Sequence, residues 1–152
     1  MTLRDLLERL QFFQLNTDEI ILQVIQDRER DVVRYVTEMQ LFMEGLRGED
    51  GAFLMDVHPY HPYTIQVKME KGQPTDRVTL RDTGDFHDSF FIEYGDAEFL
   101  ITASDWKTEE LMEKYGEGIM ALSDENLKGL RSGIIRPGLL EKLKETIYEN
   151  SG

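Results

Sequence analysis

The stretch LRDTGDFHDSFFIEYGDAEFLITAS, residues 80–104, decides the fold of this 152-residue chain. Within it, the segments SFFIEY and AEFLITAS are rich in Phe, Ile and Tyr, which are residue types that favour strands. Gly95 and Asp96 lie between the two segments and predict a tight turn. We therefore expect an antiparallel hairpin over about residues 89–103.

The beginning of the same stretch predicts a corner in the backbone. The RVTL segment before it is typical of a short strand. Asp82 or Thr83 can accept a backbone N–H from residues two or three positions ahead, and Gly84 gives freedom in φ. One short helical turn then follows, with Phe86 and Phe90 packed inward, four residues apart. These five residues predict a structural corner between a strand and a helix.

Helical patterns precede this region. Thr2 is a good cap for a short helix through about Phe13, and Asn16 or Thr17 offers a second cap. Apolar residues then recur at three- and four-residue steps, which predicts one long amphipathic helix that ends near Gly45. The members of this stripe are Ile21, Val24, Ile25, Val32, Val36, Met39 and Met43.

Helical patterns also follow the hairpin. Thr108 is a candidate cap and Gly116 a stop for one helix, Ser123 caps the next, and Pro137 suits the first turn of the last. Helices on both sides of a small antiparallel sheet predict an α+β fold.

The chain length predicts a single domain over residues 1–152. We expect a helical arm over 1–47, a loop and small sheet over 48–107, and C-terminal helices over 108–148. The segment YTIQVKMEKGQP in the middle part fits both a strand and a helix with a glycine stop.

The composition excludes several classes of protein. The chain has no cysteine, so disulfides, thiol catalysis and zinc–thiolate sites are excluded. No run of apolar residues is long enough to span a membrane, and the first residues do not have the pattern of a signal peptide, so an intracellular product is expected. The net charge of −13 argues against tight binding of nucleic acid, because phosphate contacts need cations.

The tripeptide Asp82-Thr83-Gly84 is also the catalytic signature of aspartic proteases. In those enzymes two such loops face each other, and the two aspartates share a proton. Here Arg81 stands before the motif, where an apolar residue is expected, and Asp85 follows it, where a small one is expected. An added carboxylate would disturb a shared-proton pair. A homodimer could still supply a second aspartate, so the protease stays an alternative.

The histidines do not form a strong metal motif. His58 and His61 lie near Asp56 in a proline-containing loop, and His87 lies between two aspartates. Because this spacing matches no established ligand pattern, we expect surface or packed histidines, with no metal and no cofactor. The chain also has no nucleotide-binding or hydrolase motif, which favours a non-enzymatic protein.

The second half of the chain resembles a known class of proteins. Residues that match its corner motif are Asp82, Thr83, Gly84, Phe86, Ser89 and Phe90, and a following segment matches through Asp105, Lys107, Thr108, Leu111, Tyr115 and Gly116. Over roughly residues 40–148, the chain resembles virion structural proteins of tailed bacteriophages, of the head–tail connector or tail-completion class, as in crAss-like phages that infect Bacteroides.

The resemblance implies a ring-forming subunit at the portal–tail junction, with portal and neighbouring neck or tail proteins as partners. Phage DNA would pass through the lumen without specific binding, and an acidic lumen repels phosphate. The protein would be found in the virion, and in the host cytoplasm during assembly, without a membrane partner. A helix over the ambiguous segment before the corner fits this class. Candidate interface residues are Tyr60, Tyr63, Trp106 and the face of the helix over 18–45.

Two alternatives to the connector remain open. One is a dimeric aspartic protease that uses Asp82. The other is a small adaptor protein of a mobile element.

Overall fold

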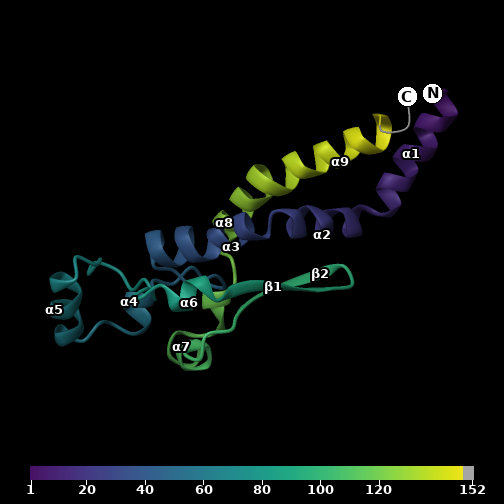
Figure 1. Ribbon diagram of the computed structural model, residues 1–152. Helices are drawn as coiled ribbons and strands as arrows, with labels where there is room; N and C mark the ends of the chain where they lie inside the picture. Colours follow the sequence, from purple (N-terminus) through teal and green to yellow (C-terminus); the bar gives the residue numbers. More distant parts are fainter. Residues whose placement is uncertain (149–152) are drawn as a thin grey trace.

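The computed structural model describes residues 1–148, which form an elongated molecule (Figure 1). Its helices are α1 (Leu3–Leu15), α2 (Thr17–Asp27), α3 (Glu29–Arg34), η1 (Tyr35–Glu44), α4 (Leu54–Val57), α5 (Pro62–Glu70), α6 (Asp85–Asp88), α7 (Thr108–Tyr115), η2 (Glu117–Met120), α8 (Asp124–Leu130), η3 (Arg131–Ile135) and α9 (Arg136–Tyr148). Two strands, β1 (Phe90–Gly95) and β2 (Glu98–Ala103), form one antiparallel sheet. The predicted α+β class is therefore confirmed.

The hairpin agrees with its sequence pattern. Phe90 pairs with Ala103 at the open end and Gly95 with Glu98 beside the turn. Ile92 and Ile101 pair with each other and are buried, so they lie on the inner face. Since side chains alternate along a strand, the outer face carries the residues between them.

The predicted long helix over residues 17–45 is interrupted, which corrects the sequence-based prediction. Arg28 has φ −123° and ψ 30°, so the backbone leaves the helical conformation between α2 and α3. This break lets α2 pack on α9 while α3 packs on β1. From Tyr35 the helix continues with π geometry, and it ends at Gly45, whose φ of 65° suits glycine.

A fully buried polar side chain lies in the π-helical segment. The Oε1 atom of Gln40 accepts the backbone N–H of Ser123 at 2.7 Å and the Nδ2 of Asn126 at 3.3 Å. Ser123 also caps α8 through the backbone N–H of Asn126, as predicted. Gln40 therefore joins the N-terminal helices to the C-terminal ones.

The core lies between the N-terminal helices, the hairpin and the C-terminal helices. Its buried residues come from all three parts, and include Ile25, Val32, Val36, Leu41, Leu54, Val78, Phe86, Phe90, Ile92, Ile101, Tyr115, Ile119, Leu130 and Ile134. Burying such side chains is the dominant favourable contribution to folding.

The RVTL segment is not a strand in the structure, which corrects a second prediction. The Tyr60 hydroxyl accepts the Thr79 N–H at 3.2 Å, and Nε2 of His87 lies 2.9 Å from the Thr79 carbonyl oxygen. Side chains thus satisfy backbone groups that a neighbouring strand would otherwise satisfy. The helix expected from the resemblance over the ambiguous segment is present as α5.

The C-terminal helices also differ in one respect from the prediction. Pro137 does not start a separate helix, because α8, η3 and α9 follow one another without a loop. The N–H of Arg136 bonds to the carbonyl of Arg131, five residues back, so the turn before the proline is wide. Such a turn accommodates the missing N–H of proline. Thr108 likewise begins α7 instead of capping it, since Lys107 occupies the cap position.

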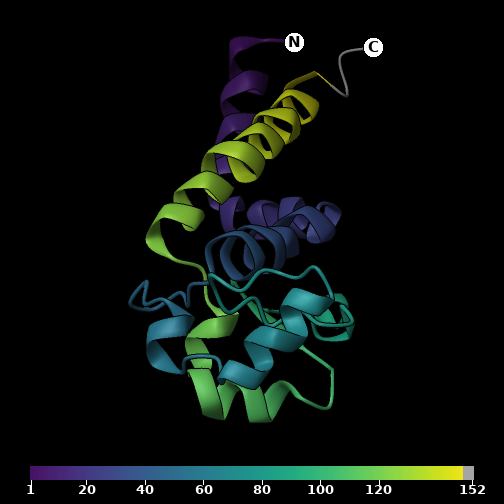
Figure 2. The ribbon, with the colours of Figure 1, turned by 90° about the vertical axis from the view of Figure 1, so that its left-hand side faces the viewer.

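The two terminal helices form an arm that projects from the body. In Figures 1 and 2, α1 and α9 run antiparallel at one end of the molecule, so that the start of α1 lies near the end of α9. Thr2 and Asp5 form a capping box at the start of α1, which confirms Thr2 as the cap. Arg9 donates to the carbonyl of Ile147 and so joins α1 to the end of α9.

Candidate functional site

The corner at Asp82-Thr83-Gly84 leads into the one-turn helix α6. Gly84 has φ 93°, a left-handed conformation that suits glycine, and Thr83 Oγ1 accepts the N–H of Asp85 at 3.3 Å. The Asp82 carboxylate faces elsewhere: its Oδ1 lies 2.9 Å from Lys71 Nζ and 3.1 Å from Gln73 Nε2. The tripeptide thus bends the chain and joins it to the end of α5.

Asp82 is held in its ionised form. The hydrogen bonds from Lys71 and then Gln73 lower the pKa of its carboxyl below the usual value. An aspartic protease instead needs two carboxylates that share a proton. In the part of the chain that the structure describes, the hydrogen-bond partners of the Asp82 carboxylate are an amine and an amide.

The aromatic residues of the corner lie inside the protein. Phe86 and Phe90 are 4% and 8% exposed, and their ring centroids are 5.0 Å apart in an edge-to-face arrangement. His87, between them in sequence, is also buried, and burial lowers its pKa, so the neutral ring is favoured. Its bond to Thr79 fixes the backbone before the corner.

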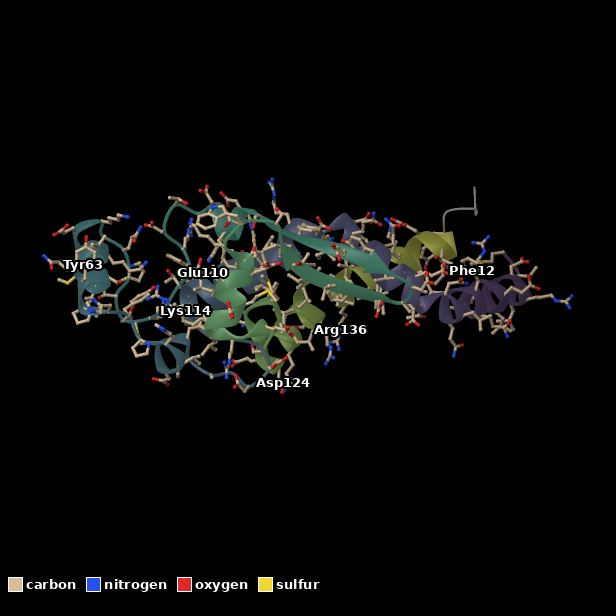
Figure 3. The ribbon with its side chains drawn as sticks, turned by 90° about the horizontal axis from the view of Figure 1, so that it is seen from below. Phe12, Tyr63, Glu110, Lys114, Asp124 and Arg136 are labelled. Atoms are coloured by element: carbon tan, nitrogen blue, oxygen red, sulfur yellow. The ribbon has the colours of Figure 1, made fainter. Side chains whose placement is uncertain are left out.

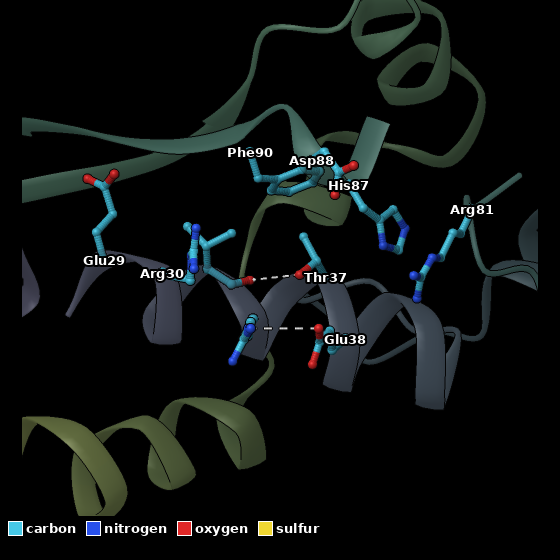
Figure 4. A pocket seen from close by; sticks show the side chains of 10 residues that line it. Glu29, Arg30, Thr37, Glu38, Arg81, His87, Asp88 and Phe90 are labelled. Carbon is cyan, nitrogen blue, oxygen red and sulfur yellow. Dashed lines mark hydrogen bonds and ion pairs between the residues drawn. The ribbon is translucent and has the colours of Figure 1, made fainter. Parts of the chain in front are cut away.

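A cavity of about 530 Å³ lies beside the corner, between η1 and His87 (Figure 4). Arginines and carboxylates both line it; these charged residues are Glu29, Arg30, Arg34, Glu38, Arg81 and Asp88. Arg34 is paired with Glu38 at 3.8 Å, and the Arg81 guanidinium lies over the Phe42 ring at 4.9 Å. The lining thus carries three basic and three acidic side chains.

The histidine-containing loop does not gather metal ligands. Nδ1 of His61 accepts the N–H of Tyr63 at 3.1 Å and caps α5, and His58 packs edge-on against Tyr115 at 5.9 Å. Among residues 1–148 there is no group of three or more His, Cys, Asp or Glu side chains placed to hold a metal ion.

The three aromatic interface candidates have different environments. Tyr60 is partly buried, since its hydroxyl bonds to Thr79 and the Lys68 ammonium lies 5.2 Å from its ring centroid. Tyr63 is 69% exposed at the end of the molecule far from α1 (Figure 3), and Trp106 is 80% exposed before α7. Tyr63 and Trp106 are therefore accessible to a partner, whereas Tyr60 is part of the body. On the helix predicted over 18–45, Met39 and Met43 are exposed.

The arm carries apolar side chains that the monomer leaves uncovered. No residue of α1 is buried. The exposed apolar residues of this helix are Leu3, Leu7, Leu10, Phe12 and Leu15, with exposures from 39% to 85%. The sequence predicted a helix here, from Thr2 to about Phe13, but nothing in the sequence showed that the body would leave these side chains uncovered.

An apolar groove runs between α1 and α9. Its volume is about 380 Å³, and it is lined by Phe13, Ile135, Leu139, Leu140 and Leu143, together with Arg131 and Arg136. Both arginines are exposed, and neither has an ion-pair partner among residues 1–148. Sequence reasoning missed this groove, because Phe13 of α1 is far in the chain from the residues of η3 and α9 that line the rest of it.

Comparison with protein-family models, with curated proteins and with solved structures finds no match to this chain. Among the described residues no helix is both long and apolar enough to cross a membrane.

Proposed function

We propose that this chain is a structural virion protein that assembles into a ring at the portal–tail junction of a tailed bacteriophage. The observation that carries the proposal is the uncovered apolar face of α1. Leu3 is 72% exposed and Leu7 is 51% exposed, one helical turn apart on the same face. Soluble monomers rarely leave large contiguous apolar patches in water, and such patches mark interaction sites.

Burying this face would stabilise an assembly substantially. Full burial of one leucine side chain contributes about 1.5–3 kcal/mol relative to leaving it in water. The arm projects from the body (Figure 2), so a neighbouring copy can reach the face of α1 without rearrangement of the core. Contacts between different faces of neighbouring copies generate rings when the rotation closes.

The charge of the chain supports the same proposal. With 30 acidic and 17 basic side chains, a ring of copies has a strongly negative surface. Such a lumen repels the phosphates of DNA, which would let a genome pass without adhering. Portal and tail proteins are the partners that this position implies.

The test is the mass of the assembled protein. Mass photometry and light scattering should show species at multiples of 17.7 kDa that grow with concentration or on addition of portal protein. The double variant Leu3→Glu with Leu7→Glu should shift the protein to monomer while circular dichroism stays unchanged, because both side chains lie outside the core. A wild type that stays monomeric, alone and with portal protein, would overturn the proposal.

A matched control separates the apolar contact from the added charge. Phe53 and Met69 are 56% and 67% exposed and lie outside the arm, so Phe53→Glu with Met69→Glu adds the same charge elsewhere. Assembly should survive in this control. A wild type that stops at a dimer would instead favour the adaptor protein among the alternatives.

A further inference from the structure

Two exposed surfaces of this chain are complementary in charge and in apolar character. The first is the arm groove, which we define by Phe13, Leu139, Leu140 and the two arginines Arg131 and Arg136. All the charged residues that line it are cationic, although the chain as a whole has a net charge of −13.

The second surface is the outer face of the hairpin. On this face Phe91 is 36% exposed and Leu100 is 59% exposed, although both are large apolar side chains. Glu93 lies opposite Leu100, and Glu98 lies opposite Gly95, on the same face. Residues 90–103 include three acidic side chains and no basic one, so the tip of the hairpin is anionic throughout.

The hairpin cannot reach the groove of its own chain. In Figure 1, α2 lies between the hairpin and α9, and the buried Ile92 and Ile101 place the inner face of the hairpin against the core. Tyr94 holds that orientation, because its hydroxyl donates to Glu29 of α3 at 2.8 Å. The outer face is thus open only to another molecule.

We infer that the outer face of the β1–β2 hairpin docks into the arm groove of a second copy of this chain. Phe91 and Leu100 would cover the leucines of the groove, and Glu93 and Glu98 would pair with Arg131 and Arg136. Arginine–carboxylate pairs of this kind give direction and orientation to an interface. The inference rests on the proposed function, since it adds a second contact between neighbouring subunits to the one made by the apolar face of α1.

The contact is between two different faces, and this has a consequence for the assembly. Each copy offers one hairpin and one groove, so every added copy leaves one of each free until the ring closes. In a twofold dimer, the hairpin of each copy would have to enter the groove of the other copy at the same time. A single hairpin–groove contact between successive copies instead predicts a ring or a filament.

Charge reversal tests the pairing of the two surfaces. The groove variant is Arg131→Glu with Arg136→Glu, and the hairpin variant is Glu93→Lys with Glu98→Lys. In each variant alone, like charges face each other, and we expect self-association to weaken by at least ~100-fold. Because all four side chains are exposed, both variants should keep the circular dichroism of the wild type.

An equimolar mixture of the two variants is the decisive sample. The lysine-bearing hairpin of one variant then meets the glutamate-bearing groove of the other, and the remaining wild-type hairpin and groove also match. We expect the mixture to regain assembly in a one-to-one ratio, although neither variant assembles alone. Mass photometry measures the size, and native mass spectrometry the ratio, because the variants differ in mass.

A control variant and the possible outcomes separate this inference from the proposed function. Arg4→Glu with Lys144→Glu makes the same change of charge on α1 and α9, outside the groove lining, and should assemble as the wild type does. If either reversed variant still assembles, or if the mixture stays monomeric, the hairpin contact is wrong. The proposed ring is not overturned by either result, and the apolar face of α1 is then its main contact. A wild type that never assembles overturns both.

Discussion

Replacing Phe86 by alanine should destabilise the protein more than any change at the exposed part of the corner. Phe86 is 4% exposed and meets Phe90 at 5.0 Å, and it is one of two buried residues of the one-turn helix α6. Removing a buried phenylalanine costs about 3–5 kcal/mol, which combines the lost burial with the cavity left behind. A loss of about 4 kcal/mol lowers the ratio of folded to unfolded protein by roughly three orders of magnitude.

Urea denaturation followed by circular dichroism measures this loss in the free energy of unfolding. It should be done on the monomeric Leu3→Glu, Leu7→Glu background, so that dissociation does not add to the signal. Phe53→Ala is the matched control, because Phe53 is 56% exposed, and we expect it to cost less than about 1 kcal/mol. Equal losses at the two positions would refute the argument that the buried aromatic residues, and not the tripeptide alone, hold the corner.

Three further predictions concern polar residues. Asp82→Asn should lower the free energy of unfolding by less than about 1 kcal/mol, since the ion pair of Asp82 with Lys71 is half exposed. We also expect no peptide cleavage by either protein. If the wild type cleaves a peptide and this variant does not, the result favours the protease. Because burial lowers the folded-state pKa of His87, the unfolded state binds its proton more readily, so stability should fall as the pH drops below the ordinary value of 6.5. His87→Gln should weaken the dependence of the free energy of unfolding on pH, measured by urea denaturation at several pH values. The same pH dependence in this variant and in the wild type would contradict the role of His87. Gln40→Leu should lower the free energy of unfolding by about 1–3 kcal/mol, because it leaves the buried N–H of Ser123 without its acceptor. Urea denaturation measures this loss as well. An unchanged free energy of unfolding would mean that another group accepts this N–H.

Parts of the candidate surfaces could be predicted from the sequence. The hairpin followed from two segments rich in Phe, Ile and Tyr on either side of Gly95 and Asp96. The outward position of Glu93 and Leu100 became clear only from the strand pairing and from the burial of Ile92 and Ile101. Tyr60, a candidate interface residue, is partly buried, and nothing in the sequence indicated that its hydroxyl would accept a backbone N–H from a segment 19 residues away.

The sequence by itself determined where several local elements begin: Thr2 and Ser123 cap their helices, and Gly84 permits the left-handed turn before α6. These outcomes depend on residues within a few positions of each other, so a local pattern is sufficient. Only the tertiary structure decided the break at Arg28 and the groove that joins Phe13 to Leu139. Both depend on which distant segments pack together, because helices of similar sequence pattern can bury or expose the same face according to the partner that the fold supplies.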